Sequence, residues 1–195
     1  MEAQVSPELF PHIRIVMGTV LGLGITRLLM GVAGLVQHPH RAGLSSIHLL
    51  WVGSILLELI HFWWWQFALF QLTGWHFGIF FFLIAYTIVL FLLATLLFPD
   101  PIHEYDGYED FFMKRRGWFF GLFASTFIFD IIDSMLKDAR YWEEFGLHYY
   151  IQVPVGLILC AFAIWTADRR FHIGAVLLHL AYQLSRITRL FYMNA

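Results

Sequence analysis

Apolar segments of roughly membrane-spanning length recur six times along the 195-residue chain. About 20 helical residues cross the ~30 Å hydrocarbon core of a bilayer. A backbone in lipid must satisfy its own polar groups, as helices and closed barrels do, and these runs are too long and too continuously apolar for barrel strands. We therefore expect an all-α, polytopic membrane protein, a bundle of six transmembrane helices forming a single domain over residues 1–195. The helices are expected at about 13–36, 47–69, 77–98, 118–136, 149–166 and 173–192.

Composition narrows the classes of function. Charged residues make up 13% of the chain and hydrophobic residues 59%, whereas soluble domains carry roughly 25% charged residues. The net charge is −2 and the 12 basic residues are scattered, so we expect no nucleic-acid partner. The one cysteine, Cys160, lies in an apolar run, which argues against a disulfide or a cysteine-rich metal site.

The segment 44–70 is apolar but carries ionisable residues. Glu58 and His61 lie near its middle and His48 near its start. A charged side chain in lipid costs a few kcal/mol or more, so these groups should face protein or water. We therefore interpret one helix face as the wall of an internal site. At ~100° per residue, an arc of about 140° holds His48, Trp51, Ser54, Glu58, His61 and Trp65.

The fourth and sixth apolar segments carry matching polar residues. Asp133 and Lys137 are four residues apart and are expected to pair. The second, fourth and sixth helices run in the same direction, and Glu58, Asp130 and Arg186 each lie about 12–15 residues from a helix start, so they share a depth. A stripe within about 120° on the sixth helix holds His172, His179, Tyr182, Gln183, Arg186 and Arg189.

These positions predict a buried polar core that links four helices. Arg27 is a single charge deep in the first segment, so an acidic partner is expected for it. His48 and His172 would lie at the opposite mouth of a pathway. The predicted core contains three acids and two arginines, and this excess of one acid makes Glu58 the candidate titrating group. The predicted core consists of Arg27, Glu58, His61, Asp130, Asp133, His179 and Arg186.

Intramembrane carboxylates and histidines are typical of proton and ion paths. We therefore expect a small channel or transporter for protons or small ions. A purely structural role for the polar core is one alternative, because hydrogen bonds and ion pairs also hold helices together in lipid. Others are a haem- or quinone-binding membrane subunit using His61 and His179, and a non-catalytic membrane sensor or partner protein.

No catalytic motif is present, so an enzyme is not favoured. Glu58 and His61 form an ExxH step of the di-iron kind, but the chain has no second such step, and no metal or other cofactor is expected. Expected partners are membrane lipids and a small ion or proton. A homo-oligomer could use the small face formed by Gly18, Gly22 and Thr26.

The placement of basic residues predicts an orientation. They concentrate in connections such as 114–116 and 169–170, which lie on one side of the predicted bundle. Because basic loops stay on the cytoplasmic side, we expect both termini outside, in a bacterial inner membrane.

Overall fold

A computed structural model of the chain describes residues 9–38, 43–72, 74–137 and 139–192. These residues form six long helices and two short 3₁₀ turns, and within these ranges there is no strand. The chain ends, to which the predicted orientation refers, lie outside the described residues. In chain order the elements are α1 (Leu9–Gln37), α2 (Ser46–Trp65), η1 (Gln66–Gln71), α3 (Phe77–Thr95), η2 (Ile102–Glu104), α4 (Tyr108–Lys137), α5 (Ala139–Trp165) and α6 (Arg169–Tyr192).

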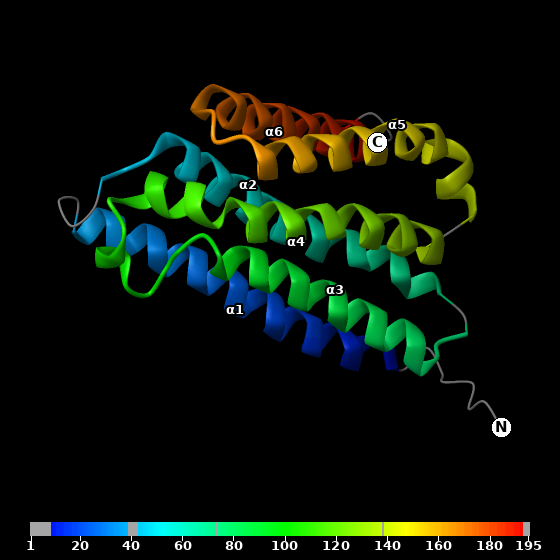
Figure 1. Ribbon diagram of the computed structural model, residues 1–195. Helices are drawn as coiled ribbons and strands as arrows, with labels where there is room; N and C mark the ends of the chain where they lie inside the picture. The colour runs from blue at the N-terminus through cyan, green and yellow to red at the C-terminus, as the bar shows by residue number, and fades with distance from the viewer. Residues whose placement is uncertain (1–8, 39–42, 73, 138, 193–195) are drawn as a thin grey trace.

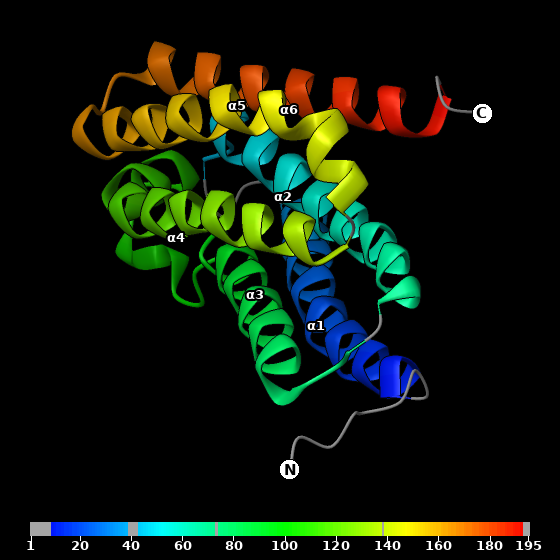
Figure 2. The ribbon, with the colours of Figure 1, turned by 90° about the vertical axis from the view of Figure 1, so that its right-hand side faces the viewer.

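The six helices form three layers of two (Figure 1). α1 lies along α3, α2 and α4 occupy the middle, and α5 and α6 form the third layer. Figure 2 shows the same order from the side, with α1 and α3 steeply inclined to α5 and α6. α4 packs along α5 and α2 along α6, whereas α5 and α6 contact each other little. Polar residues of the middle layer are therefore enclosed from both sides.

Four helical stretches in the described part of the chain are long and apolar enough to cross a bilayer. The apolar stretch of α5, Tyr150–Trp165, is shorter. α6 carries arginines such as Arg186 and Arg189 among its apolar residues, which lowers its hydropathy. All six expected helices are present, and six spans remain a prediction. The four stretches are Phe10–Gln37, Ser46–Phe70, Phe77–Thr95 and Tyr108–Lys137.

α4 begins at Tyr108 rather than at 118, where the apolar run starts. Glu109 and Asp110 lie in its first turn, where carboxylates stabilise a helix N-terminus. Lys114 Nζ donates to Asp110 Oδ2 at 2.8 Å one turn later. Phe112 is buried, so this charged stretch is also anchored to the core. α5 likewise begins before its apolar run, at Ala139 rather than at 149.

The small face of α1 is partly used inside the bundle. A Cβ on Gly18 would press against the Trp63 ring; on another side of α1, a Cβ on Gly31 would overlap the Phe98 ring. At Gly22 a Cβ would meet nothing within 4 Å. α1 therefore approaches its neighbours closely at Gly18 and Gly31. A contact between two copies of the chain through this face remains a prediction.

Gly31→Ala is expected to lower the free energy of unfolding by about 1–3 kcal/mol, because Phe98 is only 4% exposed and has little room to move. Gly22→Ala, on the same helix, is the matched control. It should be neutral or should stabilise by up to about 1 kcal/mol, since alanine favours helix over glycine. Thermal unfolding of both variants in one detergent measures the difference. Equal effects would contradict the packing explanation.

Candidate functional site

Polar side chains of α2 and α6 meet in the middle of the bundle. Ser54 Oγ lies 2.8 Å from His179 Nδ1. The Gln183 amide donates to Glu58 Oε2 at 2.6 Å and to the Ser54 carbonyl at 3.3 Å. Ser54 and Gln183 are buried and Glu58 is half-buried. The polar faces predicted for the second and sixth segments therefore face each other.

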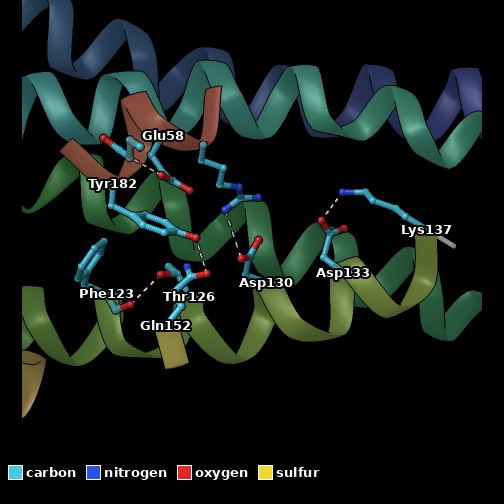
Figure 3. A network of polar contacts seen from close by, with 10 residues as sticks. Glu58, Phe123, Thr126, Asp130, Asp133, Lys137, Gln152 and Tyr182 are labelled. Atoms are coloured by element: carbon cyan, nitrogen blue, oxygen red, sulfur yellow. Dashed lines mark hydrogen bonds and ion pairs between the residues drawn. The ribbon is translucent and has the colours of Figure 1, made fainter. Parts of the chain in front are cut away.

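α4 and α5 complete this group. Arg186 Nη1 donates to Asp130 Oδ2 at 3.4 Å, and the two side chains are 17% and 13% exposed. Tyr182 Oη donates to Gln152 Oε1 at 2.5 Å, which brings in α5 (Figure 3). We call the whole group the central polar cluster. Its members are Ser54, Glu58, Asp130, Gln152, His179, Tyr182, Gln183 and Arg186.

Asp133 and Lys137 form a buried ion pair further along α4, as their spacing predicts (Figure 3). Their side chains are 1% and 0% exposed. The Trp65 ring lies 5.2 Å from Lys137 Nζ and 5.8 Å from the Arg186 guanidinium. Trp65 therefore contacts both the ion pair and the central polar cluster.

A small cavity of about 30 Å³ lies inside the central polar cluster. His61 of α2 and Tyr86 of α3 line it together with cluster residues such as Glu58 and Asp130. One water molecule needs roughly 10–15 Å³, so the cavity has room for a water molecule or two. Ionisable groups from three helices thus share a space of water size.

Aromatic rings close the bundle beyond His179. The Trp51 ring packs on four phenylalanines of α4 with centroids 5.0 to 6.5 Å away, and His179 stacks on Trp51 at 5.8 Å. These rings are at most 6% exposed. The central polar cluster ends against them. We call them the aromatic cluster, which consists of Trp51, Phe112, Phe119, Phe120 and Phe123.

The two predicted mouth residues, His48 and His172, lie beyond the aromatic cluster. A carbonyl oxygen only accepts, so His48 Nε2 donates to the Leu97 carbonyl at 2.5 Å and His172 Nε2 to the Thr166 carbonyl at 3.0 Å. Both residues are 0% exposed. The structure encloses these histidines in protein, and the aromatic cluster separates them from the central polar cluster.

Arg27 lies elsewhere. Its guanidinium pairs with the Asp100 carboxylate and donates to the Phe98 carbonyl at 2.8 Å. Asp100 is largely exposed. The Arg27 side chain points to the segment after α3, where Phe98 and Asp100 lie, and not toward Glu58. The expected acidic partner is therefore present, but outside the central polar cluster.

Sequence reasoning missed Gln152 and Tyr86 as site residues. Gln152 is a polar residue in the apolar stretch of α5, and Tyr86 lies in the apolar run of α3. Tyr182 and Gln183 lie on the predicted stripe of α6 but were not among the predicted core residues. Gln152 and Tyr86 each appear in the sequence as a single polar group within an apolar run. Neither belongs to a repeating pattern that would mark a helix face.

The histidines considered for haem do not form a haem pocket between them. His61 and His179 both line the cavity of about 30 Å³, whereas cofactor pockets measure about 300–1,000 Å³. Among the described residues, no group of three histidine, cysteine or acidic side chains is placed to hold a metal ion.

The fold and the central polar cluster are the features available for describing this protein. Comparison of the chain with protein-family models, with curated proteins and with solved structures finds no match. The described residues form an all-helical bundle with ionisable side chains of α2, α4 and α6 at its centre.

Proposed function

We propose that the chain is a membrane protein with six transmembrane helices that moves protons through its central polar cluster. The observation that supports this most is the water-sized cavity that ionisable groups of three helices share. Large apolar side chains cover the outside of the bundle, as lipid contact requires. Examples with more than half of their surface exposed are Ile15, Leu29, Ile60, Phe81, Ile128 and Leu178.

The size of the cavity favours protons over metal cations. A cation that sheds its water needs several oxygen ligands, about six to eight for calcium. Among the described residues no three histidine, cysteine or acidic side chains are placed to hold a metal ion, and a volume of about 30 Å³ is small for a hydrated ion. A proton needs only hydrogen-bonding groups and a water molecule between them. This is what Glu58, Asp130 and His61 offer around the cavity.

Glu58 is the proposed proton carrier. Asp130 pairs with Arg186, and Asp133 pairs with Lys137. Glu58 instead accepts its hydrogen bond from the neutral amide of Gln183. A carboxylate with a neutral partner takes up a proton without breaking an ion pair.

Proton flux into vesicles tests the proposal. Purified protein is reconstituted into liposomes that contain a pH-sensitive dye, and a potassium diffusion potential drives proton entry. The native chain is expected to acidify the vesicles, and Glu58→Gln to reduce the rate to that of empty vesicles. Arg27→Gln is the control, because Arg27 lies outside the cluster, and should keep the native rate. Absent native flux, or full flux with Glu58→Gln, would contradict the proposal.

The aromatic cluster favours a second candidate function, in which the central polar cluster is structural and only holds the helices together. Its rings separate the central polar cluster from His48 and His172. In that case the native chain carries no flux. Glu58→Gln and Asp130→Asn would then lower thermal stability only.

A further inference from the structure

A second, larger cavity lies between α5 and α6. α5 packs on α4 and α6 packs on α2, so the two helices of the outer layer leave space between them. The cavity measures about 380 Å³, within the range of about 300–1,000 Å³ typical of small-molecule sites. We call it the lateral cavity, because it opens on the side of the bundle formed by α5 and α6.

The walls of the lateral cavity are apolar and partly aromatic. Phe120, Phe123 and Phe127 of α4 line one side. Val155 of α5 and Leu178 of α6 line the other, and both are about half exposed at the outer surface. Aromatic walls suit a flat ring, and an aliphatic opening toward the outside suits a hydrocarbon tail.

One end of the lateral cavity is polar. Tyr182 donates to Gln152 Oε1, and among the described residues the Gln152 amide nitrogen makes no hydrogen bond. Ser54 contacts His179 Nδ1, and the other ring nitrogen, Nε2, makes none in the same part of the chain. The indole nitrogen of Trp51, which is 1% exposed, also lacks a partner in the described structure. Gln152 and His179 are half-buried and the Trp51 indole nitrogen is buried, so these groups can donate hydrogen bonds to ligand oxygens in the cavity.

The depth of the polar end limits the kind of ligand. Gln152 lies halfway along α5, and Tyr182 lies near the middle of α6. In the proposed six-span arrangement, Tyr182 lies about nine residues into the span expected at 173–192, whereas Gln152 lies near the start of the apolar stretch Tyr150–Trp165, so the polar end reaches from the bilayer interior toward one interface. Arg189 is the one charged residue that lines the cavity in the described structure. The other polar groups at this end, Gln152, Tyr182 and the Trp51 indole, are uncharged hydrogen-bonding groups, and the remaining walls are apolar, so a largely apolar ligand with hydrogen-bond acceptors suits the cavity.

We propose that the lateral cavity binds an isoprenoid quinone from the bilayer. Its ring lies against Phe123 and Phe127, and its carbonyl oxygens accept hydrogen bonds from His179 and Gln152. The isoprenoid tail leaves between Val155 and Leu178 into the lipid. This inference goes beyond proton movement and rests on the membrane location in the proposed function, but not on flux.

Binding is tested by titration calorimetry of purified native protein in detergent with decylubiquinone, a short-tailed quinone. We expect saturable binding that Val155→Phe weakens at least about tenfold, because the added ring occupies the cavity. Ile158→Phe is the matched control. Ile158 lies on the same helix and is 57% exposed, outside the cavity lining, so its variant should bind as the native chain does. No saturable native binding, or equal binding by both variants, would overturn the proposal.

A second arm tests the recognition of the quinone ring. Gln152→Leu should weaken decylubiquinone binding by about fivefold, the effect of losing one hydrogen bond. Palmitate offers a chain without a ring, and competition by palmitate as strong as that by decylubiquinone would overturn the proposal. Leu178→Phe replaces Val155→Phe if the latter does not fold. Quinone binding without proton flux would contradict only the proposed function, and flux without quinone binding only this inference.

Discussion

Lys137→Met is expected to lower the free energy of unfolding by about 3–5 kcal/mol, because it leaves the Asp133 carboxylate buried without its cation. The two side chains are 0% and 1% exposed, so solvent cannot replace the lost partner. The substitution also removes the contact between Lys137 Nζ and the Trp65 ring at 5.2 Å. Thermal and chemical unfolding in one detergent measure the loss.

The double variant Asp133→Leu with Lys137→Met is the control for this result. Replacing a buried ion pair by apolar side chains of similar size is often neutral or stabilising. The double variant should therefore recover most of the stability that the single variant loses. A single variant as stable as the native chain would show that Asp133 is not buried as described.

Phe119→Ala should speed proton flux, because it opens the aromatic cluster that closes the central polar cluster. Phe119 is 1% exposed and packs on Trp51 at 5.0 Å and on Phe112 at 5.4 Å. Its loss leaves a gap beside Trp51, which stacks on His179, and beside Phe112, which contacts His172. The same truncation should cost about 3–5 kcal/mol of stability.

The vesicle assay and thermal unfolding measure these two effects separately. Phe81→Ala is the control, since Phe81 is 63% exposed on the outer face of α3 and should change neither quantity much. Lower stability with unchanged flux would show that the aromatic cluster only fills the core.

Helical periodicity predicted which faces of α2 and α6 meet. Glu58 and Gln183 lie on the two predicted stripes, and the structure joins them at 2.6 Å. Depth along parallel helices likewise predicted that Arg186 and Asp130 share a level, and they lie 3.4 Å apart. Both inferences succeed because a helix fixes the angle and the rise of every residue.

Three features could not be predicted from the pattern of a single segment: the position of Arg27, the start of α4 and the role of Gln152. Arg27 lies outside the central polar cluster because its side chain points to the segment after α3, and hydropathy does not reveal which neighbour a side chain meets. Hydropathy also misses the start of α4, where Glu109 and Asp110 begin the helix before the apolar run. Gln152 is isolated in its segment and carries no periodic signal.

α6 supplies one partner to each contact that joins two helices within the central polar cluster. His179 and Gln183 reach α2, Tyr182 reaches α5, and Arg186 reaches α4. A displacement of α6 along its axis would therefore disturb all of these contacts together. Any rearrangement that shifts α6 would therefore change its contacts to α2, α4 and α5 in one step.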